Sequence, residues 1–230
     1  FRTMTDIITQ QLGHIVGDKI GALSGPNLAK EIAEEKVAGT VIASENQGIA
    51  IEVKAMLSSN TFKVFSSQDM QGVELAGALK NIYAICCGIA HAKLVGENAL
   101  GFIVTRSMAE MSRFAVAKGA NPITFLGLAG MGDLMATCTS KLSRNFQLGE
   151  LIAEDLSLLE AKEKIGQVAE GARTLDVVYH EALKMNVSMP LVTSLYEILY
   201  SDASSDQLIQ DLLDHPNEVD VEFTYKKEKL

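Results

Sequence analysis

Residues 73–111 read VELAGALKNIYAICCGIAHAKLVGENALGFIVTRSMAEM, and their apolar side chains recur with the period of an α-helix. Between residues 73 and 92 the only formal charges, apart from His91, are those of Glu74 and Lys80. We therefore predict a long apolar helix over residues 70–92 and a second helix over 98–118. Lys80 interrupts the apolar run and polar residues follow His91, so we do not expect the first helix to span a bilayer.

The chain changes its pattern near residue 70. Before it, short β-type runs alternate with helical stretches, which is typical of an α/β sheet. The expected strands are 20–23, 39–43 and 62–65, and the expected helices are 6–16, 27–34 and 47–57. After it, helix-periodic segments follow one another at 144–153, 158–165, 171–185, 190–200 and 205–213. We predict an α+β chain with the remainder of an α/β domain at 1–70 and an all-α domain at 71–230.

Lys80 is the side chain in this apolar helix that needs an explanation. A lone lysine in such a helix extends its ammonium to water, pairs with an acid, or lies in a functional cleft. Burial weakens a lysine's preference for the charged form, so a buried lysine can exchange a proton near neutral pH. The neighbouring Asn81 adds a donor and an acceptor. The residues alone leave both a snorkelling lysine and a catalytic lysine open.

Residues 127–145 read GLAGMGDLMATCTSKLSRN and hold a second group of polar side chains. We expect a glycine-punctuated turn that carries Asp133, followed by Ser143, Arg144 and Asn145 where the next helix begins. A hydroxyl, a guanidinium and a carboxamide at a helix start form a donor-rich patch suited to a phosphate or a carboxylate. The alternative is that Ser143 only caps the helix and that Arg144 is a solvated surface charge.

Composition limits the partners and the kinds of site. The chain has 20 Lys and Arg against 29 Asp and Glu, a net charge of −9, which disfavours nucleic acid or an anionic membrane as the main partner. Cys86, Cys87 and Cys138 have the spacing of neither a disulfide framework nor a metal site, so we expect reduced core thiols. The histidines are scattered and no metal is expected. No signal peptide opens the chain, which agrees with a cytoplasmic protein.

Several short motifs follow one another in series along nearly the whole chain. They are Ser24-Gly25-Pro26-Asn27 with Ala29, Gly77-Ala78-Leu79-Lys80-Asn81, the run from Gly127 to Asp133, Thr137-Cys138, Ser143-Arg144-Asn145, and Gln167-Val168-Ala169-Glu170-Gly171. In residue type, order and separation they resemble the NAD(P)-dependent glycerol-3-phosphate dehydrogenases of the bacterial, soluble type. The resemblance implies an enzyme that interconverts sn-glycerol 3-phosphate and dihydroxyacetone phosphate with NAD or NADP. Such an enzyme supplies glycerol 3-phosphate for phospholipid synthesis in the cytoplasm.

The resemblance also implies roles for individual residues. It makes Lys80 the group that takes the proton from the secondary hydroxyl of the substrate and returns it in the reverse reaction. It places Asn81, Asp133 and Thr137 around the reacting carbon and its hydroxyls. Arg144 would bind the substrate and also reach the cofactor. The other implied contacts are with the substrate at Ser143, Asn145, Gly25 and Asn27, and with the cofactor at Ala29, Val168 and Glu170.

The implied fold is the C-terminal part of a Rossmann-like α/β domain followed by an all-α domain like the C-terminal domain of 6-phosphogluconate dehydrogenase, and a homodimer is compatible with it. The chain departs from the family because no Gly-x-Gly-x-x-Gly follows an apolar strand near its start. We therefore expect that roughly 100 residues of the nucleotide domain are absent. Two other interpretations stay open: a related 3-hydroxyacid or ketopantoate type reductase, and a non-catalytic helical interaction module.

Overall fold

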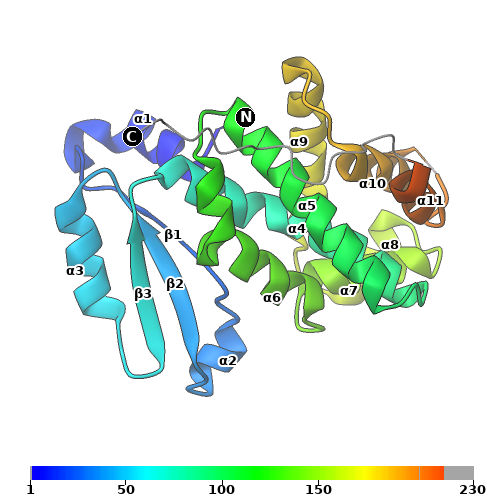
Figure 1. Cartoon of the computed structure of the whole chain (residues 1–230), viewed down its shortest axis with the longest axis horizontal. Helices are drawn as coiled ribbons and strands as arrows, with labels where there is room; N and C mark the ends of the chain where they lie inside the picture. Colours follow the sequence, from blue (N-terminus) through cyan, green and yellow to red (C-terminus); the bar gives the residue numbers. More distant parts are fainter. Residues whose placement is uncertain (1, 202, 215–230) are drawn as a thin grey trace, which may run out of the picture.

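The computed structural model describes residues 2–201 and 203–214. At its centre lies helix α4 (Met70–Ala92), around which other helices are arranged (Figure 1). Its neighbours are α5 (Glu97–Ala117), α6 (Asp133–Thr139), α7 (Arg144–Ala153) and α9 (Glu170–Met185). Asp69 caps α4, because its side chain accepts a hydrogen bond from the Gly72 nitrogen at 2.9 Å. The predicted helix over 70–92 is confirmed.

Helix α4 is long and apolar enough to cross a membrane by length and composition. However, 72% of its most apolar 18 residues is buried inside the structure. Ile82, Tyr83 and Ile85, for example, are fully buried against neighbouring helices. The apolar surface of α4 is therefore already covered by the packing of this chain.

Three strands form a small mixed sheet on one side of the helices (Figure 1). They are β1 (Ala22–Ser24), β2 (Ala38–Ala43) and β3 (Phe62–Ser67), in the order β1-β2-β3. β1 runs antiparallel to β2, whereas β2 and β3 are parallel and are joined by α3 (Gln47–Leu57). On the face that α3 covers, Ile42, Ala50 and Val64 form a cluster. The predicted strands are confirmed, each within two residues of its observed ends.

The remaining α-helices also overlap predicted segments. They are α1 (Met4–Val16), α2 (Ala29–Ala33), α8 (Leu158–Ile165), α10 (Pro190–Tyr200) and α11 (Gln207–Asp214). α1 begins with a capping box, in which Thr3 and Asp6 each accept a hydrogen bond from the backbone of the other. The sequence predicts an all-α domain that extends to residue 230. Residues 215–230 of it lie outside the described residues.

The glycine-punctuated segment after α5 is helical, so the prediction of a turn there is wrong. Pro122–Leu126 is a 3-10 helix (η1), Leu128–Gly132 is a single π-helical turn (η2), and α6 follows directly. A Cβ at Gly130 would lie 2.2 Å from the carbonyl oxygen of Phe125. Gly130 is therefore needed for a close backbone contact and not for chain reversal. Single π turns of this kind occur frequently at functional sites.

Two glycines let α4 and α7 approach each other at backbone distance. A Cβ at Gly149 would lie 2.1 Å from the carbonyl oxygen of Ile85, and a Cβ at Gly88 would lie 2.1 Å from that of Phe146. Any larger residue at either position would push the two helices apart. This crossing places the first turn of α7 beside the middle of α4.

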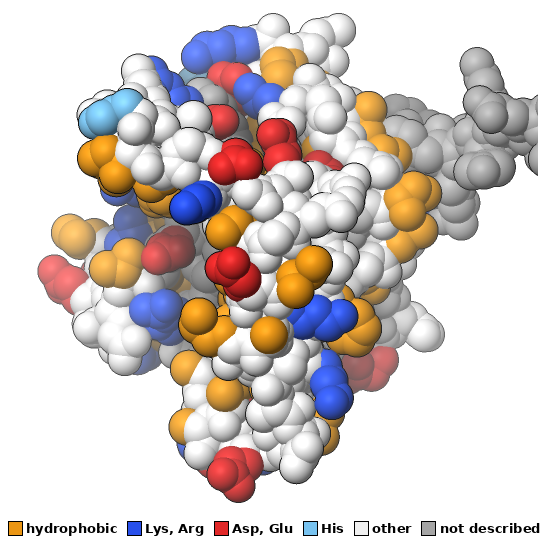
Figure 2. Space-filling view, turned by 90° about the vertical axis from the view of Figure 1, so that its left-hand side faces the viewer, with side chains coloured by type: hydrophobic (Ala, Val, Ile, Leu, Met, Phe, Trp, Pro, Cys, Tyr) orange, Lys and Arg blue, Asp and Glu red, His pale blue; other side chains and the backbone are white. Residues whose placement is uncertain are grey.

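The cysteine thiols lie inside the structure, and the surface carries charges of both signs. The three cysteines are free and buried, as predicted. On the face shown in Figure 2, basic and acidic side chains are interspersed with apolar ones. Within residues 2–201 and 203–214, no three His, Cys, Asp or Glu side chains converge as metal ligands would.

Candidate active site

A cavity of about 730 Å³ lies where the sheet meets α1, α4 and α6. Its wall is formed by the first turns of α1, by β1 with the loop after it, by α4 and α6, and by the first residue of α9. The predicted site residues that line it are Gly25, Asn27, Lys80, Asn81, Asp133, Thr137 and Glu170. Residues far apart in the sequence therefore share one cavity.

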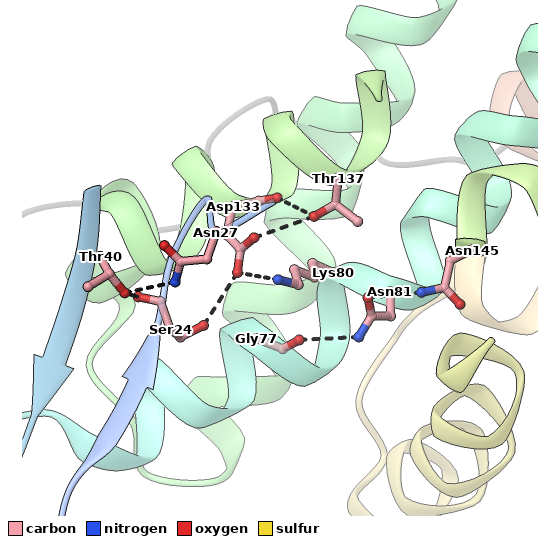
Figure 3. A network of polar contacts seen from close by, with 9 residues as sticks. All are labelled: Ser24, Asn27, Thr40, Gly77, Lys80, Asn81, Asp133, Thr137 and Asn145. Atoms are coloured by element: carbon pink, nitrogen blue, oxygen red, sulfur yellow. Dashed lines mark hydrogen bonds and ion pairs between the residues drawn. The ribbon is translucent and has the colours of Figure 1, made fainter. Parts of the chain in front are cut away.

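Lys80 and Asp133 form an ion pair in this cavity (Figure 3). The Lys80 ammonium contacts Oδ2 of Asp133. The Asp133 side chain is only 3% exposed, whereas that of Lys80 is 19% exposed. The lysine is thus held by a buried acid and keeps access to the cavity. Of the arrangements that the sequence leaves open, the structure shows a lysine paired with an acid in a cleft.

Further contacts enclose the carboxylate of Asp133. Ser24 Oγ lies 3.4 Å from Oδ2, and Thr137 Oγ1 lies 3.4 Å from Oδ1 and donates to the Asp133 carbonyl oxygen at 2.6 Å. Burial raises the pKa of Asp133 above its ordinary value, and the Lys80 ammonium is the largest of the influences that oppose this rise. A carboxylate enclosed in this way holds the ammonium in one place and offsets its charge.

Asn81 is oriented by a chain of amide contacts that connects three helices. Its Nδ2 donates to the carbonyl oxygen of Gly77 at 3.4 Å, and its Oδ1 accepts from Asn145 Nδ2 at 3.0 Å (Figure 3). Asn145 Oδ1 accepts from the Gly171 nitrogen at 2.9 Å, in the first turn of α9. That nitrogen is one of the free donors of a helix start. These hydrogen bonds fix the amide of Asn81 relative to α7 and α9.

The loop after β1 presents an unpaired acceptor. Asn27 Nδ2 donates to Thr40 Oγ1 at 2.9 Å, and Thr40 donates to the carbonyl oxygen of Ser24 at 3.1 Å. Asn27 Oδ1 is buried and has no hydrogen-bond partner among the described residues. Gly25 is needed beside it, since a Cβ there would lie 2.9 Å from the carbonyl oxygen of Gly39. A buried acceptor without a partner is costly, so this oxygen suits a donor from a ligand.

The structure does not place every predicted contact residue in the wall of the cavity. Those outside it are Ala29, Ser143, Arg144, Asn145 and Val168. Ser143 caps α7 by accepting from the Phe146 nitrogen at 3.3 Å, and Arg144, the first residue of that helix, is exposed. Asn145 reaches the site only through Asn81. The capping role of Ser143 is the one that the alternative interpretation names, and an anion contact for Arg144 stays a prediction.

The cavity is also lined by polar residues that were not predicted as site residues, namely Arg2, Thr3, Thr5, Ser24 and Glu74. Ser24 contacts Asp133, and Gly77 makes room for it, because a Cβ there would lie 2.6 Å from Ser24 Oγ. Arg2 lines the cavity just before α1. In the sequence, the signal for Ser24 is its position next to Gly25 in the motif Ser24-Gly25-Pro26-Asn27. Arg2 has no such signal, because its place depends on how α1 packs against the rest of the chain.

Comparison with known proteins gives consistent matches along the chain. The model of the NAD-dependent glycerol-3-phosphate dehydrogenase C-terminus matches residues 69–210, and that of the N-terminus matches residues 1–50. Glycerol-3-phosphate dehydrogenase [NAD(P)+] of Alcanivorax borkumensis is 50% identical over 97% of this chain and 64% of its own length. The protein of that name from Pseudomonas aeruginosa is 48% identical over 97% of this chain and 65% of its own length.

Solved structures give the same result. The crystal structure of glycerol-3-phosphate dehydrogenase from Coxiella burnetii is similar with a TM-score of 0.87 and 35% identity, over 93% of this chain and 65% of that one. The structure of the Saccharomyces cerevisiae enzyme is similar with a TM-score of 0.77 and 30% identity, over 90% of this chain and 62% of that one. The chain spans about 64% of the length of the curated relatives that it matches. These matches show that the chain belongs to the NAD-dependent glycerol-3-phosphate dehydrogenase family.

Proposed function

We propose that the complete protein is an NAD(P)-dependent glycerol-3-phosphate dehydrogenase, which interconverts sn-glycerol 3-phosphate and dihydroxyacetone phosphate. The observation that carries this proposal is the Lys80–Asp133 pair, whose ammonium faces a cavity between the sheet and the helices. Family membership supports the reaction class, since the relatives from Alcanivorax borkumensis and Pseudomonas aeruginosa bear this name.

We assign the proton transfer to Lys80. Oxidation of a secondary alcohol to a ketone removes a hydride from carbon and a proton from oxygen, so a base must lie within hydrogen-bond reach of that oxygen. The Lys80 amine would accept this proton. In the reverse direction its ammonium would donate a proton to the ketone oxygen and stabilise the negative charge that develops there. The bound nicotinamide supplies the hydride chemistry itself.

The neighbours of Lys80 would hold it and the substrate in position. Asp133 fixes the ammonium and offsets its charge, and Thr137 supports that carboxylate. Asn81 offers an amide that is already oriented by other helices, and Asn27 offers an unpaired oxygen. We propose that these two amides bind the hydroxyl groups of the three-carbon substrate. Polar groups that are positioned before binding lose little freedom when the substrate arrives.

The phosphate of the substrate needs positive partners in a chain whose net charge is −9. Among the described residues, the cations that line the cavity are Arg2 and Lys80. We propose Arg144 as a further partner, with Ser143 and Asn145 beside it. Arg144 is exposed at the start of α7, where free backbone N–H groups attract anions, and its neighbour Asn145 contacts Asn81 inside the site.

The residues present fit one end of a dinucleotide. Glu170 lines the cavity, so a polar partner for the nicotinamide end exists here. We propose that Glu170, together with Ala29, Arg144 and Val168 outside the cavity, contacts the cofactor. No Gly-x-Gly-x-x-Gly occurs within these 230 residues for the pyrophosphate. We propose that it binds to a part of the longer protein that this sequence does not contain.

We further propose that the chain divides at residue 70, where β3 has ended at Ser67 and α4 begins at Met70, into the remainder of a nucleotide-binding domain (1–70) and a substrate domain (71–230). We also propose that the protein acts in the cytoplasm, as a homodimer, and supplies glycerol 3-phosphate for phospholipid synthesis. The bacterial origin of the named relatives supports the cytoplasmic setting.

Substrate preference tests the proposed function. The full-length protein should be assayed with NAD and NADP against sn-glycerol 3-phosphate, glycerol, a 3-hydroxyacid and pantoate. We expect kcat/KM for sn-glycerol 3-phosphate to exceed that for glycerol by about 100-fold or more, because only the phosphate makes charged hydrogen bonds. A preference for the 3-hydroxyacid or pantoate would identify a related reductase instead. Oxidation of none of them would indicate a non-catalytic module.

A further inference from the structure

The side chain of Thr40 connects both ends of the short loop that follows β1. Thr40 lies on β2 and is fully buried. Its Oγ1 accepts a hydrogen bond from Asn27 Nδ2 at 2.9 Å and donates one to the carbonyl oxygen of Ser24 at 3.1 Å (Figure 3). A Cβ at Gly25, between these two residues, would lie 2.9 Å from the Cα of Thr40. The loop therefore rests on the backbone of β2 and is held there by one hydroxyl group.

The hydroxyl of Thr40 also decides which way the amide of Asn27 points. A hydroxyl has one hydrogen to donate, and a carbonyl oxygen can only accept. The hydrogen of Thr40 is committed to the carbonyl of Ser24, so Thr40 meets Asn27 as an acceptor. Asn27 must then turn its amide nitrogen toward Thr40, which leaves Oδ1 buried and without a donor from the described part of the chain. Asn27 thus contributes an acceptor, and not a donor, to the cavity that it lines.

An acceptor at this place sets a requirement on the ligand. A buried acceptor without a partner is costly, so the group that binds there has to be a donor. In the proposed reaction the C2 oxygen is a hydroxyl in the alcohol, but in the ketone it can only accept. The C1 hydroxyl, in contrast, is a donor in both the substrate and the product. The C1 hydroxyl is therefore the group that matches Oδ1 of Asn27 in both directions.

We propose, on the basis of the function proposed above, that Thr40 is a positioning residue that fixes the direction of the Asn27 amide, and that Asn27 Oδ1 accepts a hydrogen bond from the C1 hydroxyl of the substrate. The site then selects three-carbon phosphates whose terminal carbon carries a hydroxyl. A methyl group at that carbon leaves the buried oxygen unpaired, which a site built for a hydrogen bond penalises strongly. A carboxylate there is disfavoured too, because at neutral pH it offers only acceptors.

Two ketones, measured in the reducing direction with the full-length protein, test this selection. They are dihydroxyacetone phosphate and hydroxyacetone phosphate, in which a methyl group replaces the terminal CH2OH. We expect kcat/KM of the wild type to favour dihydroxyacetone phosphate by about 100-fold or more. Thr40→Val keeps the side-chain volume but frees the amide, so this preference should fall by at least about tenfold. Thr40→Ser keeps the hydroxyl and should retain the preference to within about threefold.

Ser44→Ala is the matched control. Ser44 directly follows β2, is buried and donates to the carbonyl oxygen of Ile20 at 2.6 Å, but it does not line the cavity. This variant should lose stability and keep the substrate preference. Circular dichroism and the thermal midpoint identify the variants that fold, and the comparison of the two ketones on the wild type needs no variant.

Three results would overturn the assignment while the proposed function stands, because dihydroxyacetone phosphate is reduced in each of them. They are equal use of both ketones by the wild type, an undiminished preference in a folded Thr40→Val variant, and a loss of preference in Ser44→Ala as large as that in Thr40→Val. Reduction of neither ketone by the wild type would overturn the proposed function and the role of Thr40 with it.

Discussion

Replacing Gly149 with alanine tests the helix crossing on which the candidate site depends. The added Cβ would lie 2.1 Å from the carbonyl oxygen of Ile85 and 2.8 Å from the nitrogen of Ile89. Both atoms belong to the backbone of α4, so no change of side-chain rotamer relieves the contact. Since ordinary contacts of a Cβ begin at 3.4 Å, α7 has to move away from α4 by roughly 1 Å.

The magnitude follows from two opposing effects. Overpacking a closely packed contact costs about 1–3 kcal/mol, and more where backbone has to move. Exchange of glycine for alanine within a helix returns at most about 1 kcal/mol. The displacement also loosens the packing of Phe146 and Leu148, which are buried on α7. We expect the free energy of unfolding to fall by about 2 kcal/mol, which lowers the thermal midpoint of a chain of this size by about 4–8 °C.

Thermal and denaturant unfolding followed by circular dichroism measure this change. Gly101→Ala is the matched control, because Gly101 also lies inside a helix but its added Cβ would meet no atom within 4 Å. We expect Gly101→Ala to raise the free energy of unfolding by about 0.5–1 kcal/mol. If Gly149→Ala is as stable as Gly101→Ala, α4 and α7 do not cross at backbone distance and our account of how Asn145 reaches Asn81 fails.

Three further predictions concern charged groups. Burial raises the pKa of Glu110 from 4.5 to about 7, so the folded state binds its proton more tightly than the unfolded state, and the free energy of unfolding should fall as pH rises from about 4.5 to 7. Over this pH range the wild type should lose about 3 kcal/mol of its free energy of unfolding relative to the Glu110→Gln variant. Parallel pH curves for the two proteins would contradict this prediction. In the full-length protein, Asp133→Asn should lower kcat by about 100-fold and shift the pH–rate profile, because the ammonium loses its buried partner, and an unchanged profile would leave the pair a purely structural role. Arg144→Ala should raise KM for sn-glycerol 3-phosphate by about 10–100-fold, and an unchanged KM would exclude this residue from phosphate binding.

Most helices of this chain can be predicted because their signals are local. The ranges predicted for α4, α7, α8 and α10 coincide with the observed bounds, since apolar periodicity and capping residues such as Ser143 and Ser157 mark them in the sequence. The same reasoning fails for the segment before α6. Its glycines suggest a turn, but Gly130 is there because η2 passes within contact distance of Phe125. Such a requirement exists only in three dimensions.

In the candidate site, too, some features can be predicted from the sequence and others cannot. Lys80 stands out in the sequence because it is a lone charge in an apolar helix, and the resemblance supplies Asp133 as a neighbour in the site. Their direct contact joins residues 53 positions apart, which spacing alone could not reveal. The direction of a side chain at a helix start is equally hidden, so Arg144 and Asn145 look equivalent in the sequence. In the structure the first is exposed and the second is buried.

The central claim is that the ammonium at position 80 moves the proton, and Lys80→Ala in the full-length protein tests it most directly. The measurement compares kcat for sn-glycerol 3-phosphate with the Kd of the reduced cofactor, using Lys54→Ala on the exposed surface of α3 as the control. We predict that kcat falls by about 100- to 10,000-fold in Lys80→Ala while the Kd of the cofactor changes by less than about threefold. A kcat within about tenfold of the wild-type value, or an equal loss of turnover and cofactor affinity, would contradict the account.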